Sequence, residues 1–421
     1  MKNGLNIFRN YELAFFIAKR MRQSRGNKSN VSSKIITIAT IAVALGIMMI
    51  LIAFATGKGM QKEIQQKAVA FNGHLNVVHI ENENQELTIY PFEDQPEVRE
   101  LLDSHDQVVD YFPFAIKAGI LKTSDDFEGI LFKGVDSKYQ WDALGDFLVR
   151  GSFPQLSDQN RSEILISENI ATRLRLDLGD WVEAAFQYDA SQQYPNRRKF
   201  TISGIYNSGF TDIDNSLIMG DIGHIQKINR WESNDIGGYQ IMIENFKQLE
   251  DLSQKLYQEL PMNLGVVSLL SKYELIFQWI SIFDFNILII LIIMLVVGVM
   301  NMSTALLALI FERTAMIGLF KAYGATNRLI QRIFLTNGVL IMVRGLVAGN
   351  LLSLVFYFTQ KQWSWIRLDP ETYFVSSAPV HLTLWQILGV NVLFLLVSVV
   401  LLWLPSLMVM RIAPAKILRI T

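Results

Sequence analysis

Four long runs of apolar residues dominate the hydropathy pattern of this 421-residue chain. An α-helix needs roughly 20 apolar residues to cross the hydrocarbon core of a bilayer. We therefore predict membrane spans over residues 35–57, 275–311, 333–358 and 384–410. The first run is too long for the core of a signal peptide, and no A-x-A cleavage site follows it. We expect it to be a retained helix.

The polar segment between the first two runs, residues 58–274, alternates short strand-like and helix-like stretches. The predicted strands cover residues 74–80, 115–121, 129–133, 163–166, 181–188, 200–206 and 239–243. The predicted helices cover residues 96–103, 168–174 and 246–259. This alternation indicates mixed α+β structure in the segment.

Charge is distributed unevenly, although the net charge is only −1. Residues 58–274 hold 20 Lys and Arg against 34 Asp and Glu, whereas the rest of the chain holds 18 against 5. Because Lys and Arg are enriched in cytoplasmic loops, the basic segments 1–34, 312–332 and 411–421 are predicted to be cytoplasmic. Residues 58–274 and the charge-balanced loop 359–383 are then extracytoplasmic. The predicted fold class is an α-helical membrane protein with four transmembrane helices plus a large mixed α+β extracytoplasmic domain between the first and second.

Residues 11–21, with the sequence YELAFFIAKRM, place Leu13, Phe16 and Ile17 near one face of a helix. A basic cluster follows them. The pattern predicts an amphipathic helix that lies among the lipid headgroups before the first span. A disordered basic tail is the alternative.

No motif for catalysis or metal binding stands out. The chain has no cysteine and lacks the G-x-x-x-x-G-K-[ST], H-E-x-x-H and G-x-S-x-G patterns. Its five histidines are scattered along the sequence. We therefore predict that the chain is not an enzyme and carries no cofactor or metal of its own.

Two charged residues fall in or near the predicted spans. Asp284 lies at the outer edge of the second span, and Arg344 lies near the middle of the third. A charge within a membrane is costly and marks a functional site by default. Asp284 is close enough to the interface to be hydrated. We expect Arg344 to face protein or water, with an acid or a lipid phosphate as its partner.

Residues 312–332, with the sequence ERTAMIGLFKAYGATNRLIQR, predict a short amphipathic helix on the cytoplasmic side. Gly324 is expected to end this helix and Thr326 to cap the next one. A short helix of this kind suits docking into a groove of a cytoplasmic protein. A membrane-surface elbow without a partner fits the pattern equally well.

The same stretch resembles the pattern E-R-x-x-x-I-G-x-[FL]-[KR]-A-x-G-A of the MacB, FtsX and LolC/LolE superfamily of ABC transporter permeases. The resemblance extends over nearly the whole chain and includes residues 14–22, 38–46, 150–153, 164–180, 200–217 and 414–419. Residues 368–380, LDPETYFVSSAPV, are similar to a stretch before the last span of the lipoprotein-releasing branch. This similarity favours LolC/LolE over MacB or FtsX.

The resemblance implies a bacterial inner-membrane permease with both termini cytoplasmic and its main domain periplasmic. Its implied partners are an ABC ATPase homodimer that binds ATP and Mg, a second permease copy or paralogue, a lipoprotein substrate, a periplasmic lipoprotein carrier and membrane lipids. No nucleic acid is expected. ATP hydrolysis on the ATPase would drive release of the lipoprotein from the membrane.

The resemblance also implies roles for particular residues. The ATPase contact would be formed by Glu312, Arg313, Ile317, Lys321, Ala322, Gly324 and Ala325. A cavity for acyl chains could be lined by Ile41, Met48, Phe54, Phe277 and Met294, although these residues could equally face lipid.

Residues 187–199 depart from the family pattern. In the family's carrier-binding member this position holds a longer, hook-like loop. Here the candidate carrier contacts are Tyr194, Pro195, Asn196, Arg197 and Arg198. A solvated hairpin loop is the alternative interpretation.

Two other functions fit the same superfamily. One is an FtsX-like transmembrane transmitter that controls cell-wall hydrolases, and the other is a MacB-like efflux permease. The size of the segment 58–274 argues against the first alternative. The lack of a fused ATPase argues against the second.

Overall fold

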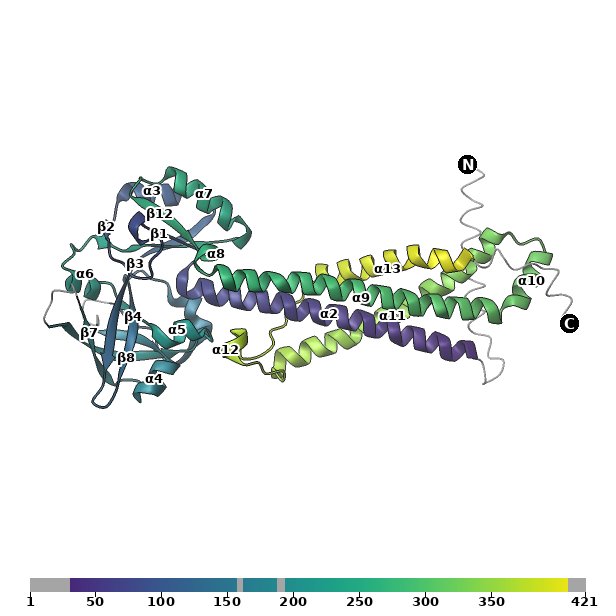
Figure 1. The fold of residues 1–421 in the computed structure, drawn as a ribbon, viewed down its shortest axis with the longest axis horizontal. Coiled ribbons are helices and arrows are strands. Elements are labelled where there is room, and N and C mark those ends of the chain that lie inside the picture. Colours follow the sequence, from purple (N-terminus) through teal and green to yellow (C-terminus); the bar gives the residue numbers. More distant parts are fainter. Residues whose placement is uncertain (1–30, 157–161, 188–193, 408–421) are drawn as a thin grey trace. The chain divides into compact units, whose positions relative to one another are not determined.

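The computed structural model describes residues 31–156, 162–187 and 194–407 (Figure 1). The predicted interfacial helix at residues 11–21 and the terminal motif at 414–419 lie outside these ranges. The described chain forms two compact units. The helical unit comprises the described residues up to Gln61, then Ile280–Ile366 and the residues from Ala378 onward. The α+β unit comprises Lys62–Trp279 and Arg367–Ser377.

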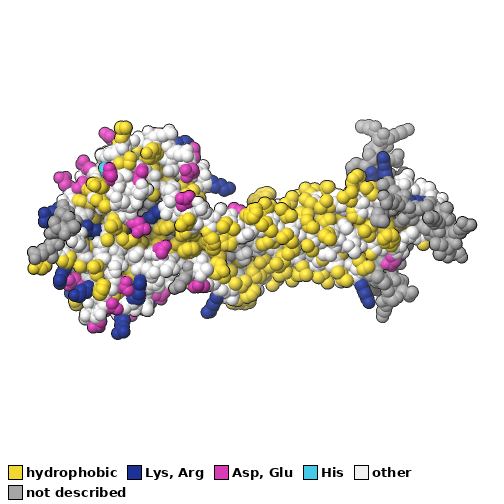
Figure 2. Space-filling view, in the orientation of Figure 1, with side chains coloured by type: hydrophobic (Ala, Val, Ile, Leu, Met, Phe, Trp, Pro, Cys, Tyr) yellow, Lys and Arg dark blue, Asp and Glu magenta, His cyan; other side chains and the backbone are white. Residues whose placement is uncertain are grey.

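Among the described residues, four helices are long and apolar enough to cross a membrane. They are α2 (Val31–Asn72), α9 (Glu274–Glu312), α11 (Asn327–Trp363) and α13 (Leu384–Ser406). Hydrophobic side chains cover the visible surface of these helices (Figure 2). The four apolar runs of the sequence are therefore confirmed as long helices.

Helix α2 continues well beyond the predicted end of the first span at residue 57. Its continuation includes Lys58, Lys62, Glu63 and Lys67, all of which are compatible with a helix. Hydropathy therefore locates the end of the apolar run, which is not the end of the helix.

Helices α2 and α11 approach each other closely at two glycines of α11, Gly345 and Gly349. A Cβ atom added to Gly345 of α11 would lie 2.6 Å from Cγ1 of Val43 on α2. At Gly349 it would lie 2.5 Å from the carbonyl oxygen of Ala44. Small residues that allow two backbones to approach are typical of packing between membrane helices.

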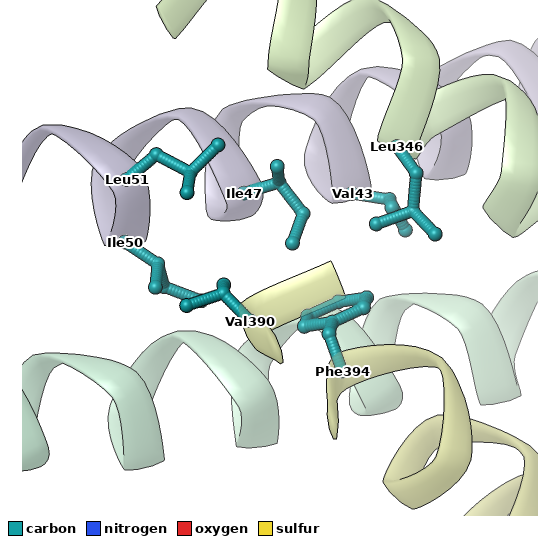
Figure 3. Packing of buried hydrophobic residues seen from close by; sticks show 7 residues of the cluster. All are labelled: Val43, Ile47, Ile50, Leu51, Leu346, Val390 and Phe394. Carbon is teal, nitrogen blue, oxygen red and sulfur yellow. The ribbon is translucent and has the colours of Figure 1, made fainter. Parts of the chain in front are cut away.

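A buried cluster joins three of the four long helices. Figure 3 shows its side chains converging from α2, α11 and α13, and its members are Val43, Ile47, Ile50, Leu51, Leu346, Val390 and Phe394. Leu291 and Met294 of α9 pack against this cluster. All four long helices therefore contribute side chains to this apolar cluster or pack against it.

The α+β unit contains a ten-stranded sheet in the order β12–β1–β11–β3–β4–β9–β6–β8–β5, and β7 pairs with both β3 and β8. Its strands are β1 (Leu75–His79), β3 (Val108–Lys122), β4 (Phe127–Val135), β5 (Leu148–Gly151), β6 (Glu163–Ser167), β7 (Trp181–Phe186), β8 (Asn196–Tyr206), β9 (Leu217–Asp221), β11 (Gly238–Ile243) and β12 (Leu264–Ser268). The pairs β4–β9 and β6–β8 are parallel, and the other pairs are antiparallel. A separate small sheet pairs β2 (Phe92–Glu93) with β10 (Asp235–Ile236).

Strands β3, β4, β9, β6, β8 and β7 form a closed ring of hydrogen-bonded neighbours. Closure removes the exposed edges that a flat sheet of these strands would present. Inside the ring, Phe132 stacks on Phe200 with 5.3 Å between ring centroids, and Phe186 meets Phe132 edge-on at 5.8 Å. The long strand β3 also pairs with β11, so it connects the ring to the β1–β11–β12 part of the sheet.

Short helices cover the sheet and connect its strands. They are η1 (Ile80–Asn82), α3 (Pro96–Ser104), η2 (Trp141–Phe147), α4 (Glu168–Leu174), α5 (Thr211–Ser216), α6 (Gly223–Asn229), η3 (Phe246–Gln248), α7 (Leu249–Glu259) and α8 (Leu269–Lys272). Two more follow α9 and α11, namely α10 (Thr314–Ala322) and α12 (Pro370–Tyr373). The predicted mixture of helices and strands is confirmed.

Candidate functional site

Helix α10 lies between α9 and α11 and has defined ends on both sides. At its C-terminus, Gly324 adopts a positive φ of 88°, and its N–H donates to the carbonyl oxygen of Lys321 at 3.0 Å. The N–H of Ala325 donates to the carbonyl oxygen of Phe320 at 2.9 Å. These two bonds form a Schellman motif, which favours glycine at the left-handed position. Thr326 then caps α11 by accepting from the Leu329 N–H at 3.3 Å. The predicted break and cap are both confirmed.

One face of α10 is fixed to the helical unit. Ile317 is fully buried in a cluster with Leu306, Leu309, Ile310, Ile330 and Phe334, and Phe320 and Ala325 pack against it. The structure therefore corrects the place of Ile317 among the predicted partner contacts. Its side chain holds α10 against α9 and α11 and does not lie on the exposed face.

The opposite face of α10 is open. Glu312, Ala322 and Gly324 are exposed, and Arg313 and Lys321 are half-buried. Two apolar residues outside the predicted set are also exposed, Leu319 at 49% and Tyr323 at 83%. Leu319 lies about half a turn around the helix from Ile317, so helical periodicity could have identified it. Tyr323 is the residue directly after α10, about a third of a turn from Ile317. Exposed apolar residues beside charges on a fixed helix form a surface suited to docking a protein.

A second candidate site is the end of the hairpin formed by β7 and β8. Tyr194 and Pro195 are exposed. Asn196, Arg197 and Arg198 already belong to β8, where they pair with Phe186, Ala185 and Ala184 of β7. This corrects the prediction that all five residues from 194 to 198 lie in a loop. The sequence did not predict the start of β8, because Lys and Arg are neither strong strand formers nor apolar.

The outward face of the strands beside this hairpin carries aromatic and basic side chains. Trp181 is 61% exposed and Phe127 is 69% exposed. Lys199 Nζ lies 3.7 Å from the centroid of the Trp181 ring, and Arg197 pairs with Glu183 at 3.1 Å. Exposed rings rimmed by charges are typical of interaction surfaces.

The residues predicted to line an acyl-chain cavity are not all brought together. Phe54 and Met294 pack against the same buried cluster of the helical unit, and Met48 is half-buried. Ile41 is 52% exposed. Phe277 belongs to the α+β unit, where it stacks on Phe246 at 5.7 Å.

The two charged residues flagged in the spans have different environments. Asp284 accepts a hydrogen bond from Lys58 Nζ at 2.6 Å, which ties α9 to α2. Arg344 is exposed on α11, so its side chain points away from the interior of the helical unit. What Arg344 contacts there stays a prediction.

The segment Arg367–Ser377 between α11 and α13 is anchored in the α+β unit. Phe374 adopts a positive φ of 59° and places its ring 5.2 Å from Phe210 and 6.1 Å from Trp279. Lys67 Nζ donates to the carbonyl oxygen of Phe374 at 3.3 Å. The aromatic contacts and this hydrogen bond hold the segment, so the predicted loop 359–383 is not a free connection.

The neighbouring carboxylate of Asp214 orders the turn on which this segment rests. It accepts from the Ser208 N–H at 3.0 Å, the Ser208 hydroxyl at 2.7 Å and the Gly209 N–H at 2.9 Å. Burial raises the pKa of Asp214, although the bonds to Ser208 and Gly209 oppose this effect. The residues that anchor Arg367–Ser377 were not identified from the sequence, because Phe374 contacts residues that are at least 95 positions away along the chain.

Two family models match the chain, one over its N-terminal part and one over its C-terminal part. Residues 36–256 match the MacB-like periplasmic core domain, which is more than half of the chain. Residues 272–414 match the FtsX-like permease C-terminal region. The second match includes α10, the segment Arg367–Ser377 and three of the four long helices.

Named relatives cover almost the full length. The chain is 20% identical to the lipoprotein-releasing system transmembrane protein LolE of Haemophilus influenzae, over 96% of this chain and 98% of that protein. It is 20% identical to LolC of Neisseria meningitidis serogroup B, over 95% of this chain and 97% of that protein. Similarity to this branch therefore extends through both units.

Two solved structures of outer domains are also similar. The periplasmic region of MacB from Actinobacillus actinomycetemcomitans is 14% identical, with a TM-score of 0.33, and the match covers 48% of this chain and 91% of that one. The extracellular domain of the noncanonic ABC-type transporter YknZ is 15% identical, with a TM-score of 0.31, and the match covers 46% and 99%. The two family matches and the full-length similarity together show that the chain belongs to the MacB/FtsX superfamily of ABC transporter permeases and resembles its LolC/LolE members.

Proposed function

We propose that the chain is a permease subunit of an ABC transporter that extracts lipoproteins from the inner membrane. The observation that supports this most strongly is the coverage of the similarity to LolC and LolE proteins, which spans 95–96% of the chain. The predicted LolC/LolE-like stretch 368–380 overlaps the segment anchored by Lys67, Phe210 and Trp279. This overlap supports the proposal, because the stretch that resembles the lipoprotein-releasing branch lies in a structured segment of the chain.

In this proposal the energy comes from a separate ABC ATPase, with ATP and Mg bound there. The ATPase docks on the exposed surface of α10 and its flanking residues, formed by Glu312 at the end of α9, Leu319 and Ala322 of α10, and Tyr323 directly after it, with Arg313 and Lys321 at its edge. Because Ile317 fixes α10 to α9 and α11, a displacement of α10 would move those two helices as well. A second permease, as a copy or a paralogue, completes the transporter.

The proposed orientation places α10 and both termini in the cytoplasm and the α+β unit in the periplasm. The basic segments 1–34, 312–332 and 411–421 support it. The hairpin of β7 and β8, with Tyr194 and the exposed Trp181, is the proposed contact for a periplasmic lipoprotein carrier. Apolar residues that include Phe54 and Met294 are proposed to meet the acyl chains.

Depletion of this chain tests the function directly. We expect lipoproteins to accumulate in the inner membrane when the chain is depleted, as measured by membrane fractionation and immunoblotting of several lipoproteins. Normal sorting of all of them after complete depletion would overturn the proposal. A cell-wall hydrolysis defect without a sorting defect would favour an FtsX-like transmitter instead.

Charge reversal tests the docking face. The double variant Glu312→Lys/Arg313→Glu should lose co-purification with the ATPase. Lys255→Glu, at an exposed position of α7 in the α+β unit, is the control and should retain it. Full recovery of the ATPase with the double variant would refute the assignment of α10 as the docking site.

A further inference from the structure

A cleft in the α+β unit is separate from α10 and from the hairpin of β7 and β8. Its volume is about 650 Å³, within the range of pockets that hold small ligands. The end of α2, the loop 82–88, strands β3 and β4 and helices α5 and α8 form its walls. None of the functions proposed above uses this cleft.

The wall formed by the loop 82–88 is held in place by hydrogen bonds. The buried side chain of Asn82 donates to the carbonyl oxygen of Tyr90 at 2.7 Å and accepts from the Ile89 and Tyr90 N–H groups at 3.2 Å. Thr88 pairs with Ile116 of β3 through its N–H, at 2.9 Å, and through its hydroxyl, at 3.0 Å. The cleft is therefore a preformed feature of the unit.

Two lysines line this cleft, of which Lys133 is buried and Lys272 is exposed. Lys133 of β4 is buried, and its Nζ donates to the carbonyl oxygen of Phe71 at 2.6 Å and to Gln240 Oε1. Lys272 of α8 donates to Asn72 Oδ1 at 2.9 Å. Neither lysine takes part in the ion pairs found among the described residues. Lys272 is exposed, and the carboxylate of Glu86, which also lines the cleft, supplies a negative charge near it. Lys133 is buried without such a carboxylate. A buried charge without a counter-charge is unfavourable, so a bound anion would be stabilised beside Lys133.

The chemistry of Lys133 agrees with binding of an anion in this cleft. Burial lowers its pKa to about 7, and the positive charge of Lys272 lowers it further in the same direction. An ammonium group has three donors, and two of those on Lys133 have the acceptors named above. The described residues provide no third acceptor, and the ring of Phe114, which also lines the cleft, has its centroid 5.3 Å from Nζ. Perturbed groups of this kind in a cleft are candidates for function.

The remaining lining suits a ligand of peptide character. Asn76 of β1 is only 9% exposed, lines the cleft, and its amide forms no hydrogen bond with the described residues. Phe114 and Val267 supply apolar wall. Amide side chains recognise main-chain amides, and apolar walls accept side chains. Glu83, Glu86 and Asp212 also line the cleft, and they would repel a ligand with many negative charges.

We propose that this cleft binds a short peptide or peptide-like ligand through a single carboxylate, held by Lys133 and Lys272, with Asn76 bonded to its main chain. The assignment goes beyond lipoprotein release and does not depend on it. Because Lys133 and Lys272 also bond to Phe71 and Asn72, at the C-terminal end of α2, the ligand would contact the residues that cap this helix.

Calorimetric titration of the full chain in detergent tests the proposal with three probes: the tripeptide Ala-Ala-Ala, its C-terminal amide and inorganic phosphate. We expect the free acid to bind and the amide to bind about tenfold more weakly or worse, because a hydrogen-bonded charge pair is lost. Asn76→Leu and Lys272→Gln should each weaken binding of the acid about tenfold. Lys255→Gln, at an exposed position of α7, should leave it unchanged.

Lys133→Met is expected to abolish binding of the acid. If that variant does not fold, Asn76→Leu and Lys272→Gln carry the test. Equal binding of acid and amide would overturn the carboxylate assignment. Binding of phosphate without the peptide, binding that all variants retain, or no binding of the acid at about 1 mM would overturn the peptide site as a whole.

Discussion

Asn350 of α11 and Asn391 of α13 exchange two side-chain hydrogen bonds within the apolar region of the helical unit. Asn350 Nδ2 donates to Asn391 Oδ1 at 2.7 Å, and Asn391 Nδ2 donates to Asn350 Oδ1 at 2.9 Å. Each amide also donates to its own helix, to the carbonyl oxygens of Leu346 and Ile387. All four amide hydrogens therefore have acceptors, which is the condition under which polar groups are tolerated inside a membrane.

Replacing one member of this pair should loosen the contact between the two helices. Asn391→Leu leaves the Asn350 amide without its partner across the interface. We expect a loss of about 1 kcal/mol in the free energy of unfolding, the magnitude typical of hydrogen bonds between membrane helices. Unfolding of the purified chain in mixed micelles, followed by circular dichroism, measures it.

The double variant Asn350→Leu/Asn391→Leu distinguishes a specific pair from two independent amides. We expect it to lose less than the sum of the two single variants, because each single change already breaks the shared bonds. Asn301→Leu, exposed on α9, serves as the control for adding an apolar side chain. Strict additivity would show that the pair contributes no coupling energy.

Phe374 gives a test of how Arg367–Ser377 is anchored. Both Phe374→Ala and Phe374→Gly remove the ring contacts with Phe210 and Trp279, so both should speed hydrogen exchange in this segment. The positive φ of 59° favours glycine. The glycine variant should therefore be more stable than the alanine variant by about 1 kcal/mol. Alanine equal to or better than glycine would show that this backbone conformation is not retained.

Gly324 gives a similar test at the end of α10. Gly324→Ala places a Cβ atom at a φ of 88°, although no neighbouring atom lies within 4 Å. The effect is therefore one of backbone conformation alone, and we expect a loss of about 1 kcal/mol in thermal or chemical unfolding. Gly389→Ala of α13 also meets no atom within 4 Å but lies within a helix, where alanine is favoured. It should be neutral or slightly stabilising, and equal losses at both positions would contradict the Schellman assignment.

The sequence predicted those elements that depend on neighbouring residues, such as apolar runs, helix caps and helix-ending glycines. The four long helices follow from apolar runs, and α4 matches its predicted bounds, 168–174, because Ser167 caps it by accepting from the Ile170 N–H at 3.1 Å. The break at Gly324 and the cap at Thr326 were likewise readable from residue type.

Features that depend on contacts between distant segments were not predictable in this way. Strand β9 was missed, and its parallel pairing with β4 joins residues about 86 positions apart, such as Leu131 and Leu217. The start of β8 at Asn196 was missed because pairing with β7 outweighs the polarity of Arg197 and Arg198. Ile317 was assigned to a partner contact because the family pattern does not say which side of α10 packs on the chain's own helices.

The pH dependence of stability tests the environment of Lys133. The pKa of this lysine is about 7 in the folded chain, first because of burial and second because of Lys272, against an ordinary value of 10.5. Between about pH 7 and pH 10.5, the unfolded chain therefore binds one more proton here than the folded chain does. Stability attributable to Lys133 must then rise with pH across this window. Below it both states are protonated, and Lys133 contributes no slope.

Lys133→Met removes this proton uptake. The difference in unfolding midpoint between the wild-type chain and the variant, measured in detergent at about pH 6, 7.5 and 9, should shift in favour of the wild type as pH rises. Slopes from groups that do not interact with Lys133 are common to both proteins and cancel in the difference. Lys272 interacts with Lys133, so any change in its own titration is part of the difference that is measured. A difference that stays constant from pH 6 to about pH 9 would mean that Lys133 keeps its ordinary pKa. Its ammonium group would then already be stabilised by the unit itself, and the case for anion binding in the cleft would fail with it.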